Sequence, residues 1–299
     1  MKSPREQYDI SVIIPTYNDS QLLSYTLTSL VRQDISKDRF EVIVADDGSS
    51  DDTEKVVRMY SKWLNVKYLF QEDKGYRPGS ARNMGIRAAE GRICLFIDAS
   101  VILNVHCLSE HIKFYQTQQR DVTAIGYVFG FDQTAESERL LKELVSPDDP
   151  AGSVKRLSMH EVFLDVREPH YANHNYRIDD LPAPWVFYWT CHVSATKKDL
   201  MEIDMFDENY DGRWGMEDFD LGFRLHRKGV GICLLRSAES IHYPHTKDMT
   251  ERKIQGYQNC IYFHNKFQTA ETELYLRNYH RIESVDVNAA CRELPEKAG

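Results

Sequence analysis

Apolar and polar positions alternate regularly through the first half of the chain. Continuous apolar runs rich in β-branched residues lie at residues 10–15, 41–45, 66–70 and 93–97. Such runs are typical of strands that are buried on both faces of a sheet. Between them, leucine and valine recur at helical spacing, as in residues 22–31. Strands that alternate with helices predict an α/β protein with a Rossmann-like, mostly parallel sheet and helices on both faces.

The pattern changes in the second half of the chain. After a predicted helix at 106–118 and a strand at 122–129, residues 132–184 are polar and contain five prolines. This composition indicates an insert of short helices and loops. The remaining elements are expected to be strands at 185–194 and 231–235, and helices at 197–205 and within 249–279. We expect an α/β domain over residues 1–246, followed by a helical extension and a loose tail over 247–299.

The stretch from Asp211 to Leu225 combines a loop pattern with two adjacent acids. Its glycines and tryptophan suit a tight loop, and Glu217 and Asp218 precede an apolar pattern that ends at Gly229. We therefore expect both carboxylates at a helix N-terminus, where the helix dipole stabilises negative charge. A carboxylate held ionised there can act as a general base. Acidic residues also favour first helical turns without any catalytic role.

Three polar residues, Thr16, Asp46 and Asp98, directly follow predicted strands. Ligands of open α/β sheets bind at the carboxyl ends of the strands. These side chains therefore predict a pocket at that edge of the sheet. The basic loop at 74–79 is punctuated by glycines and favours an anion site. The chain has no Gly-Lys-Ser/Thr sequence, which excludes a P-loop.

Charge and composition narrow the class of protein. The 299-residue chain carries a formal net charge of -9, which argues against a nucleic-acid-binding protein, whose binding face is normally basic. Its six cysteines include no Cys-x-x-Cys pair, so we expect reduced thiols and neither a disulfide framework nor a zinc knuckle. Residues 1–9 lack the apolar core of a signal peptide, and no apolar run approaches the ~20 residues of a membrane span. These features predict a cytoplasmic protein without a transmembrane segment.

Four stretches, taken together and in this order, resemble one enzyme family. They are Ser11-Val-Ile-Ile-Pro-Thr-Tyr-Asn18, Glu41-Val-Ile-Val-Ala-Asp-Asp-Gly-Ser-Ser50, Gly79-Ser-Ala-Arg-Asn-Met-Gly-Ile-Arg-Ala-Ala-Glu-Gly91 and Trp214-Gly-Met-Glu-Asp-Phe-Asp-Leu-Gly-Phe-Arg-Leu225. The chain resembles the family 2 glycosyltransferases, which are inverting enzymes with the GT-A fold. Lys74-Gly-Tyr-Arg77 and Ala81-Arg-Asn-Met-Gly85 look most like the chondroitin- and hyaluronan-polymerase branch. The resemblance implies a GT-A fold whose 132–184 insert lies on the acceptor side.

The resemblance implies a binding site for a nucleotide-sugar, with a UDP-sugar as the expected donor. The implied donor-binding residues are Pro15, Thr16, Tyr17, Asp46, Lys74, Arg77, Arg82 and Asp98. Among them, Pro15 to Tyr17 match the loop against the base, and Arg82 matches an arginine near the diphosphate. Asp46 matches an acid that accepts the N3–H of uracil, a donor that cytosine lacks. Asp47 is expected to be a turn residue that caps its own loop.

The chain departs from the family pattern at two places. Asp98-Ala-Ser100 replaces the usual Asp-x-Asp, and a hydroxyl is a weaker metal ligand than a carboxylate. The resemblance then implies a divalent metal, manganese or magnesium, held by Asp98 and by His242, with His245 a weaker candidate. The second departure is Cys191-His192, where relatives often carry Gly-Asn-x-Ser. It suggests an unusual donor or acceptor, with His192 on the acceptor side.

The expected reaction is a single displacement at the anomeric carbon. Asp218 would accept the proton of an acceptor hydroxyl on a glycan, small molecule or peptide. Glu217 would bind the acceptor or hold Asp218 in place, and Trp214 would stack on a sugar face. Arg82, Lys74 and any metal would meet the charge that develops on UDP.

Two other functions compete with this one. A noncatalytic relative could bind a sugar nucleotide or a protein partner through the same fold. The change at Ser100 favours that alternative, and the intact Trp-Gly-x-Glu-Asp stretch opposes it. A nucleotidyltransferase would normally need a glycine-rich phosphate loop and paired metal-binding acids, and neither is found in the sequence.

Overall fold

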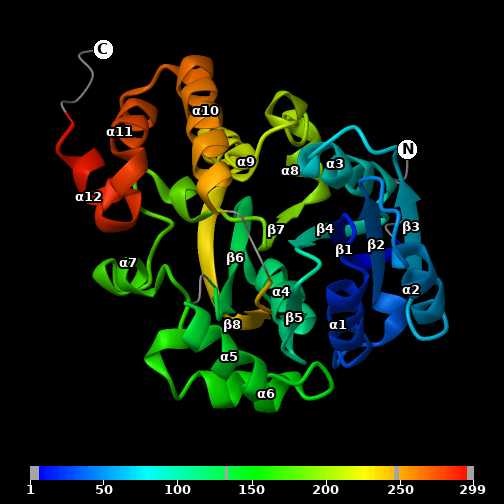
Figure 1. Ribbon diagram of the computed structural model, residues 1–299. Helices are drawn as coiled ribbons and strands as arrows, with labels where there is room; N and C mark the ends of the chain where they lie inside the picture. The colour runs from blue at the N-terminus through cyan, green and yellow to red at the C-terminus, as the bar shows by residue number, and fades with distance from the viewer. Residues whose placement is uncertain (1–6, 132–133, 246–248, 295–299) are drawn as a thin grey trace.

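A single sheet lies at the centre of the protein (Figure 1). The computed structural model describes residues 7–131, 134–245 and 249–294. Within these residues the strand order is β3-β2-β1-β4-β7-β6-β8-β5. The strands are β1 (Tyr8–Thr16), β2 (Phe40–Asp46), β3 (Val66–Phe70), β4 (Gly91–Ile97), β5 (Val101–Leu103), β6 (Val122–Phe129), β7 (His192–Thr196) and β8 (Gly231–His242).

The sheet is mostly parallel, as the alternation of strands and helices predicts. β1 pairs in parallel with both β2 and β4, β2 with β3, and β6 with β8. β7 runs antiparallel between β4 and β6, and β5 runs antiparallel to β8. The parallel half therefore brings the carboxyl ends of β1, β2 and β4 to one edge, where Thr16 and Asp46 end their strands and Asp98 follows β4.

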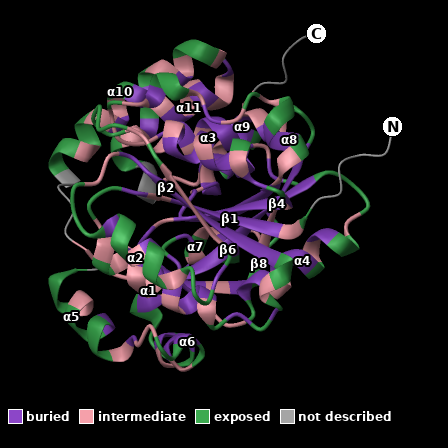
Figure 2. Ribbon diagram, turned by 90° about the vertical axis from the view of Figure 1, so that its right-hand side faces the viewer, coloured by how far each residue is buried: buried purple, intermediate pink, exposed green. Residues whose placement is uncertain are grey.

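Helices cover both faces of the sheet (Figure 2). One face carries α1 (Ser20–Val31), α2 (Thr53–Tyr60) and α4 (Cys107–Thr117), and the other carries α3 (Pro78–Ala88), α8 (Lys197–Glu202) and α9 (Glu217–Arg227). Alternate residues of β1 supply the two cores, since side chains of a strand point to opposite faces. Val12 packs in the core under α1 with Leu27, and Ile13 packs in the core under α3 with Ile86.

The insert consists of short helices, as its composition predicts. They are α5 (Ala135–Leu144), α6 (Pro150–Leu157) and α7 (Glu168–Asn173), with 3-10 turns at Glu161–Phe163 and Pro184–Phe187. The strand expected over 185–194 is wrong for most of its length, because β7 begins only at His192. Pro184 fixes φ and lacks an N–H, so it starts a 3-10 turn instead. Trp185 is fully buried against the rings of Phe223 and Phe263.

The C-terminal region folds as α10 (Met249–Phe267), α11 (Ala270–Asn278) and α12 (Val287–Arg292), with a 3-10 stretch at Tyr279–Ser284. The first helix ends because Gln268 adopts a φ of 50° and Thr269 caps α11. The expected loose tail is wrong for α12, whose N-cap Asp286 accepts a hydrogen bond from Ala289 N. The domain boundary expected at 246/247 and residues 295–299 lie outside the described residues. None of the described helices combines the length and apolar character that crossing a membrane requires.

Candidate active site

The paired acids begin α9, as the sequence predicts. Glu217 and Asp218 are its first two residues, and a tight loop precedes them. Gly212, Gly215 and Met216 all have positive φ in this loop, at 85°, 87° and 76°. A left-handed methionine is costly, and such backbone strain is concentrated at functional sites. The loop leads directly into the N-terminus of α9.

Arg82 joins the acids of α9 to the sheet. It lies on α3 and is 5% exposed. Its Nη1 is 3.0 Å from Glu217 Oε1, and its Nη2 is 3.2 Å from Asp98 Oδ1. Its guanidinium also lies 5.5 Å from the centroid of the Phe206 ring. The structure therefore brings together three predicted site residues that are far apart in the sequence.

The environment of Asp218 raises the pKa of its carboxyl and so favours the protonated form. Burial raises the pKa of Asp218 to about 8, and the charge of Glu217 adds to the shift while Arg82 opposes it. Its Oδ1 also accepts a hydrogen bond from Phe219 N at 2.8 Å. A carboxyl with a pKa near neutrality is suited to proton transfer.

Asp46, the acid expected to bind the nucleotide base, has another role in the structure. Asp46 is fully buried. Its Oδ1 accepts hydrogen bonds from Gly48 N and Ser49 N, and its Oδ2 accepts one from the Tyr68 hydroxyl at 2.7 Å. Asp46 therefore caps the turn after β2, which is the role that the sequence assigned to Asp47. The expectation that Asp46 faces a base does not fit this burial.

Asp47 and Arg77 form a pair beside that turn. Arg77 Nη2 lies 2.8 Å from Asp47 Oδ1, and the Arg77 N–H donates to Asp47 Oδ2. Gln71 donates a further hydrogen bond to Oδ1 at 2.6 Å. Burial raises the pKa of the Asp47 carboxyl, against the opposing effect of these donors. Arg77 is thus committed to Asp47, whereas Lys74 is exposed to solvent in the preceding loop.

Several polar atoms at this edge lack protein partners. Thr16 is 5% exposed, and its Oγ1 has no hydrogen-bond partner among the described residues. The same holds, in that part of the chain, for Arg82 Nε and Asp211 Oδ1. Because buried polar atoms are normally paired, these orphans favour a site that a polar ligand completes. Pro15 precedes Thr16 in β1, and the half-exposed Tyr17 donates from its hydroxyl to Asp73 Oδ2.

Ser100 and His242, from the predicted metal motif and its late histidine, lie next to each other. Both are nearly buried, and Ser100 Oγ lies 3.4 Å from His242 Nε2. The rings of Phe131 and His245 flank His242, with centroids 4.6 and 5.4 Å away. Asp98, Ser100 and His242 supply one carboxylate, one hydroxyl and one imidazole, which are weaker ligands for a divalent ion than a set with two carboxylates. The set fits an ion that a diphosphate also ligates, and it does not fit a tight protein-only site.

The two predicted acceptor residues differ in their setting. Trp214 is partly buried, and its backbone N–H donates to Gln255 Oε1. Its ring packs on Gly256, where an added Cβ would come within 3.3 Å of the ring. His192 is fully buried and bonded to interior side chains, so it offers no surface to an acceptor. The structure does not bring it into the active site.

Three further residues near the candidate active site were not among the predicted site residues. Asp211 accepts a hydrogen bond from Ser80 Oγ at 2.5 Å, and burial raises its pKa to about 6. Tyr76 is 44% exposed, and its backbone carbonyl accepts a hydrogen bond from Gly212 N at 2.7 Å. Arg252 on α10 lies 5.9 Å from the centroid of the Trp214 ring. Asp211 and Tyr76 belong to motifs that the sequence singled out, whereas nothing local marks Arg252.

The mostly parallel sheet, with Asp98 after β4 and with Arg82 and Glu217 beside it, defines the class as an α/β protein with a polar ligand site at the carboxyl ends of its parallel strands. Residues 11–177 match the family described as glycosyl transferase family 2, and residues 174–248 match the N-terminal domain of galactosyltransferase. The chain belongs to glycosyl transferase family 2.

Curated relatives share much of this chain. Validoxylamine A glucosyltransferase of Streptomyces hygroscopicus subsp. jinggangensis is 35% identical over 266 residues, which cover 89% of this chain and 63% of that protein. Chondroitin synthase of Escherichia coli is 33% identical over 250 residues, which cover 79% of this chain and 35% of that protein. The chain thus spans less than two thirds of the length of these relatives.

Solved structures share the fold. S. aureus TarS 1-349 in complex with UDP-GlcNAc aligns with a TM-score of 0.66 and 19% identity, over 96% of this chain and 76% of that one. The mannosyltransferase PcManGT of Pyrobaculum calidifontis, in complex with GDP-Man and Mn2+, aligns with a TM-score of 0.62 and 17% identity, over 96% and 75% of the two chains. These likenesses confirm the GT-A fold.

Proposed function

We propose that this protein transfers a sugar from a UDP-sugar to an acceptor hydroxyl with inversion at the anomeric carbon. The observation that carries the proposal is Arg82, which contacts Asp98 on the donor side and Glu217 at the start of the catalytic helix. One cation thus connects the two halves of a displacement reaction. Membership of the family and the orphaned polar atoms at the sheet edge support the same function.

Each residue has a distinct role in this reaction. Asp218 accepts the acceptor's proton as the oxygen attacks, which leaves the carboxyl protonated and the sugar bonded to the acceptor. Glu217 positions the acceptor and raises the proton affinity of Asp218. Arg82 stabilises the charge on the departing diphosphate, and a buried guanidinium does so without reorganising. Trp214 and Tyr76 offer aromatic surfaces to a sugar ring.

The rate should increase with pH. Below its pKa of about 8, Asp218 is protonated and cannot accept a proton. We expect kcat/KM to rise about tenfold per pH unit well below that pKa and to level off above it. Glu217→Gln should move the inflection to lower pH, because it removes a negative charge that raises the pKa of Asp218. A pH profile of both proteins checks this, and an inflection that moves upward in the variant would contradict it.

We expect Asp47, which is slightly exposed, to bind the nucleotide base, and we do not expect the fully buried Asp46 to contact it. We expect UDP to raise the melting temperature more than CDP or GDP does. Asp47→Asn should lower UDP affinity about 10- to 100-fold, the equivalent of one hydrogen bond to a charged group. Asp46→Asn should instead lower stability, because it disturbs the turn cap. Calorimetry with the three nucleotides checks both, and equal affinities in the native protein would exclude base selection.

A divalent metal would be held by Asp98, His242 and the donor diphosphate, and it would supply charge stabilisation to the leaving group. Because Ser100 provides no carboxylate, we expect weak ion binding that depends on UDP. Chelator should reduce activity, and manganese should restore it in the native protein but not in His242→Ala. Full activity in chelator would show that Arg82 acts without a metal.

The insert is proposed to bind the acceptor. A cavity of about 400 Å³ is lined by Phe131, Glu161 and Glu168 among others, and the Phe131 ring contacts the ring of His242. The cavity therefore lies next to the donor side of the site. Its carboxylates suit an acceptor rich in hydroxyl or amino groups, on a glycan, a small molecule or a peptide.

The alternative is a noncatalytic relative that binds a sugar nucleotide. The change at Ser100 is the observation that favours it. Screening UDP-sugars for both thermal stabilisation and UDP release separates the two functions. A transferase releases UDP from at least one donor, normally slowly without acceptor. Stabilisation without release from any donor, even with a glycan library added, would favour the noncatalytic alternative.

A further inference from the structure

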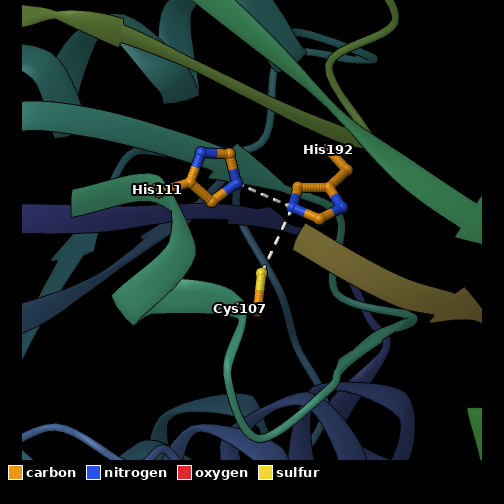
Figure 3. A group of neighbouring side chains, drawn as sticks. All are labelled: Cys107, His111 and His192. Atoms are coloured by element: carbon orange, nitrogen blue, oxygen red, sulfur yellow. Dashed lines mark hydrogen bonds between the residues drawn. The ribbon is translucent and has the colours of Figure 1, made fainter. Parts of the chain in front are cut away.

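Three potential metal ligands converge inside the protein (Figure 3). Cys107 and His111 lie one turn apart on α4, and His192 begins β7. His192 Nε2 is 3.3 Å from Cys107 Sγ and 3.0 Å from His111 Nε2. All three residues are fully buried, and their ligand atoms lie within 4.8 Å of one another. We call them the Cys-His-His cluster.

The surrounding residues create space for this cluster and orient it. A Cβ on Gly126 of β6 would come within 2.2–2.4 Å of the His192 ring, so only glycine leaves room for it. Ser240 Oγ lies 2.8 Å from His192 Nδ1, and Ser194 Oγ lies 2.9 Å from His111 Nδ1. Outer hydrogen bonds of this kind fix the tautomer of metal-bound histidines.

The tautomers of His111 and His192 determine which hydrogen bonds the three side chains of the cluster can form. When both Nδ1–H groups donate to the serines, the two Nε2 lone pairs and the sulfur point at one another. A neutral network without an ion can pair the two rings through one Nε2–H, but the Cys107 sulfur must then share His192 Nε2 with His111, either as a second donor or as a second acceptor. A cation bound to all three atoms satisfies each of them.

We propose that the Cys-His-His cluster binds one thiophilic d10 cation, Zn²⁺ or Cu⁺, that ties α4 to β7. Thiolate and imidazole are the ligands that such ions prefer. On binding, the Cys107 thiol releases its proton to solvent and forms a metal–sulfur bond, with no change of oxidation state. Cu⁺ with one thiolate leaves the buried site neutral, whereas Zn²⁺ leaves one positive charge, so charge balance favours Cu⁺.

The cluster would act on the active site through the sheet. His192 pairs with Ile97, the residue before Asp98, and Ser240 lies two residues before His242. An ion in the cluster would therefore stabilise the strands that present the donor side. Its ligands are different from Asp98 and His242, so it is a second site with a structural role.

Metal analysis of the native chain tests the proposal without any variant. The full chain is refolded with Zn²⁺, or with Cu⁺ under argon, and is then dialysed. Elemental mass spectrometry measures the metal content per chain. We expect about one ion per chain with at least one of the two, and Co²⁺ should produce a thiolate-to-cobalt absorption band. Either ion at that ratio supports the site and identifies the metal. The proposal would be overturned if the chain retained neither ion and showed no cobalt band.

A matched pair of cysteine variants locates the ion. Cys107→Ser should abolish metal retention and lower the melting temperature. Cys94→Ser removes another fully buried thiol, on β4 and outside the cluster, and should keep the metal. Full metal retention by Cys107→Ser would overturn the assignment. If Cys107→Ser does not fold, the cobalt band of the native chain still reports whether a thiolate binds.

Discussion

Asp218→Asn should lose about 10²- to 10⁴-fold in turnover, the usual contribution of a positioned base, while it binds UDP with nearly unchanged affinity. An amide has the size of the carboxyl but cannot accept the proton of the attacking hydroxyl. The expected loss therefore falls on kcat, because the base acts on the acceptor in the transition state. Single-turnover kinetics together with UDP calorimetry measure the two effects separately.

Asp204→Asn is the matched control, because it makes the same chemical change at an exposed carboxylate. Its φ of 59° is one that asparagine also tolerates. We expect native activity from it. Should Asp218→Asn retain the native rate, Glu217 would become the candidate base, and Glu217→Gln would then show the larger loss.

The sequence predicted the elements that carry strong periodicity. The strands β1 to β4 and the start of α9 lie where apolar runs and the Glu217-Asp218 pair placed them. The sequence-based prediction failed where contacts between distant residues determine the local structure. Trp185 is an example, because its ring is buried by aromatic side chains of α9 and α10. The prediction also missed α12, because a short helix at the end of a chain has little periodicity to detect.

The site shows the same division. The sequence named Arg82, Asp98 and Glu217, but only the fold shows that one guanidinium contacts both carboxylates. Asp46 and Asp47 are adjacent acids in one motif, and only the hydrogen bonds from Gly48 N and Ser49 N show that Asp46 caps the turn. His192 was assigned to the acceptor from its place in a motif. Its side chain points to α4 instead, where Cys107 and His111 carry an i, i+4 pattern that a search for Cys-x-x-Cys does not detect.

Arg82→Lys should lower both stability and activity. A lysine keeps the charge, but its single ammonium lacks the planar fork that reaches Glu217 and Asp98 together. We expect the free energy of unfolding to fall by about 1.5–3 kcal/mol, the contribution of one hydrogen bond between charged groups. UDP affinity and kcat should both fall, because the cation no longer meets the diphosphate in a fixed position. Urea unfolding, UDP calorimetry and initial rates measure the three quantities.

Arg87→Lys provides the control on the same helix. The Arg87 side chain is 54% exposed, and its guanidinium lies 3.5 Å from Glu208. An exposed pair contributes little, so we expect stability within about 0.5 kcal/mol of the native protein. Combining Arg82→Lys with Glu217→Gln tests whether the two residues act together. If they do, the double variant loses less stability than the two single losses added, since each change breaks the same contact. Additive losses, or native stability and rate in Arg82→Lys, would contradict the bridging role of Arg82.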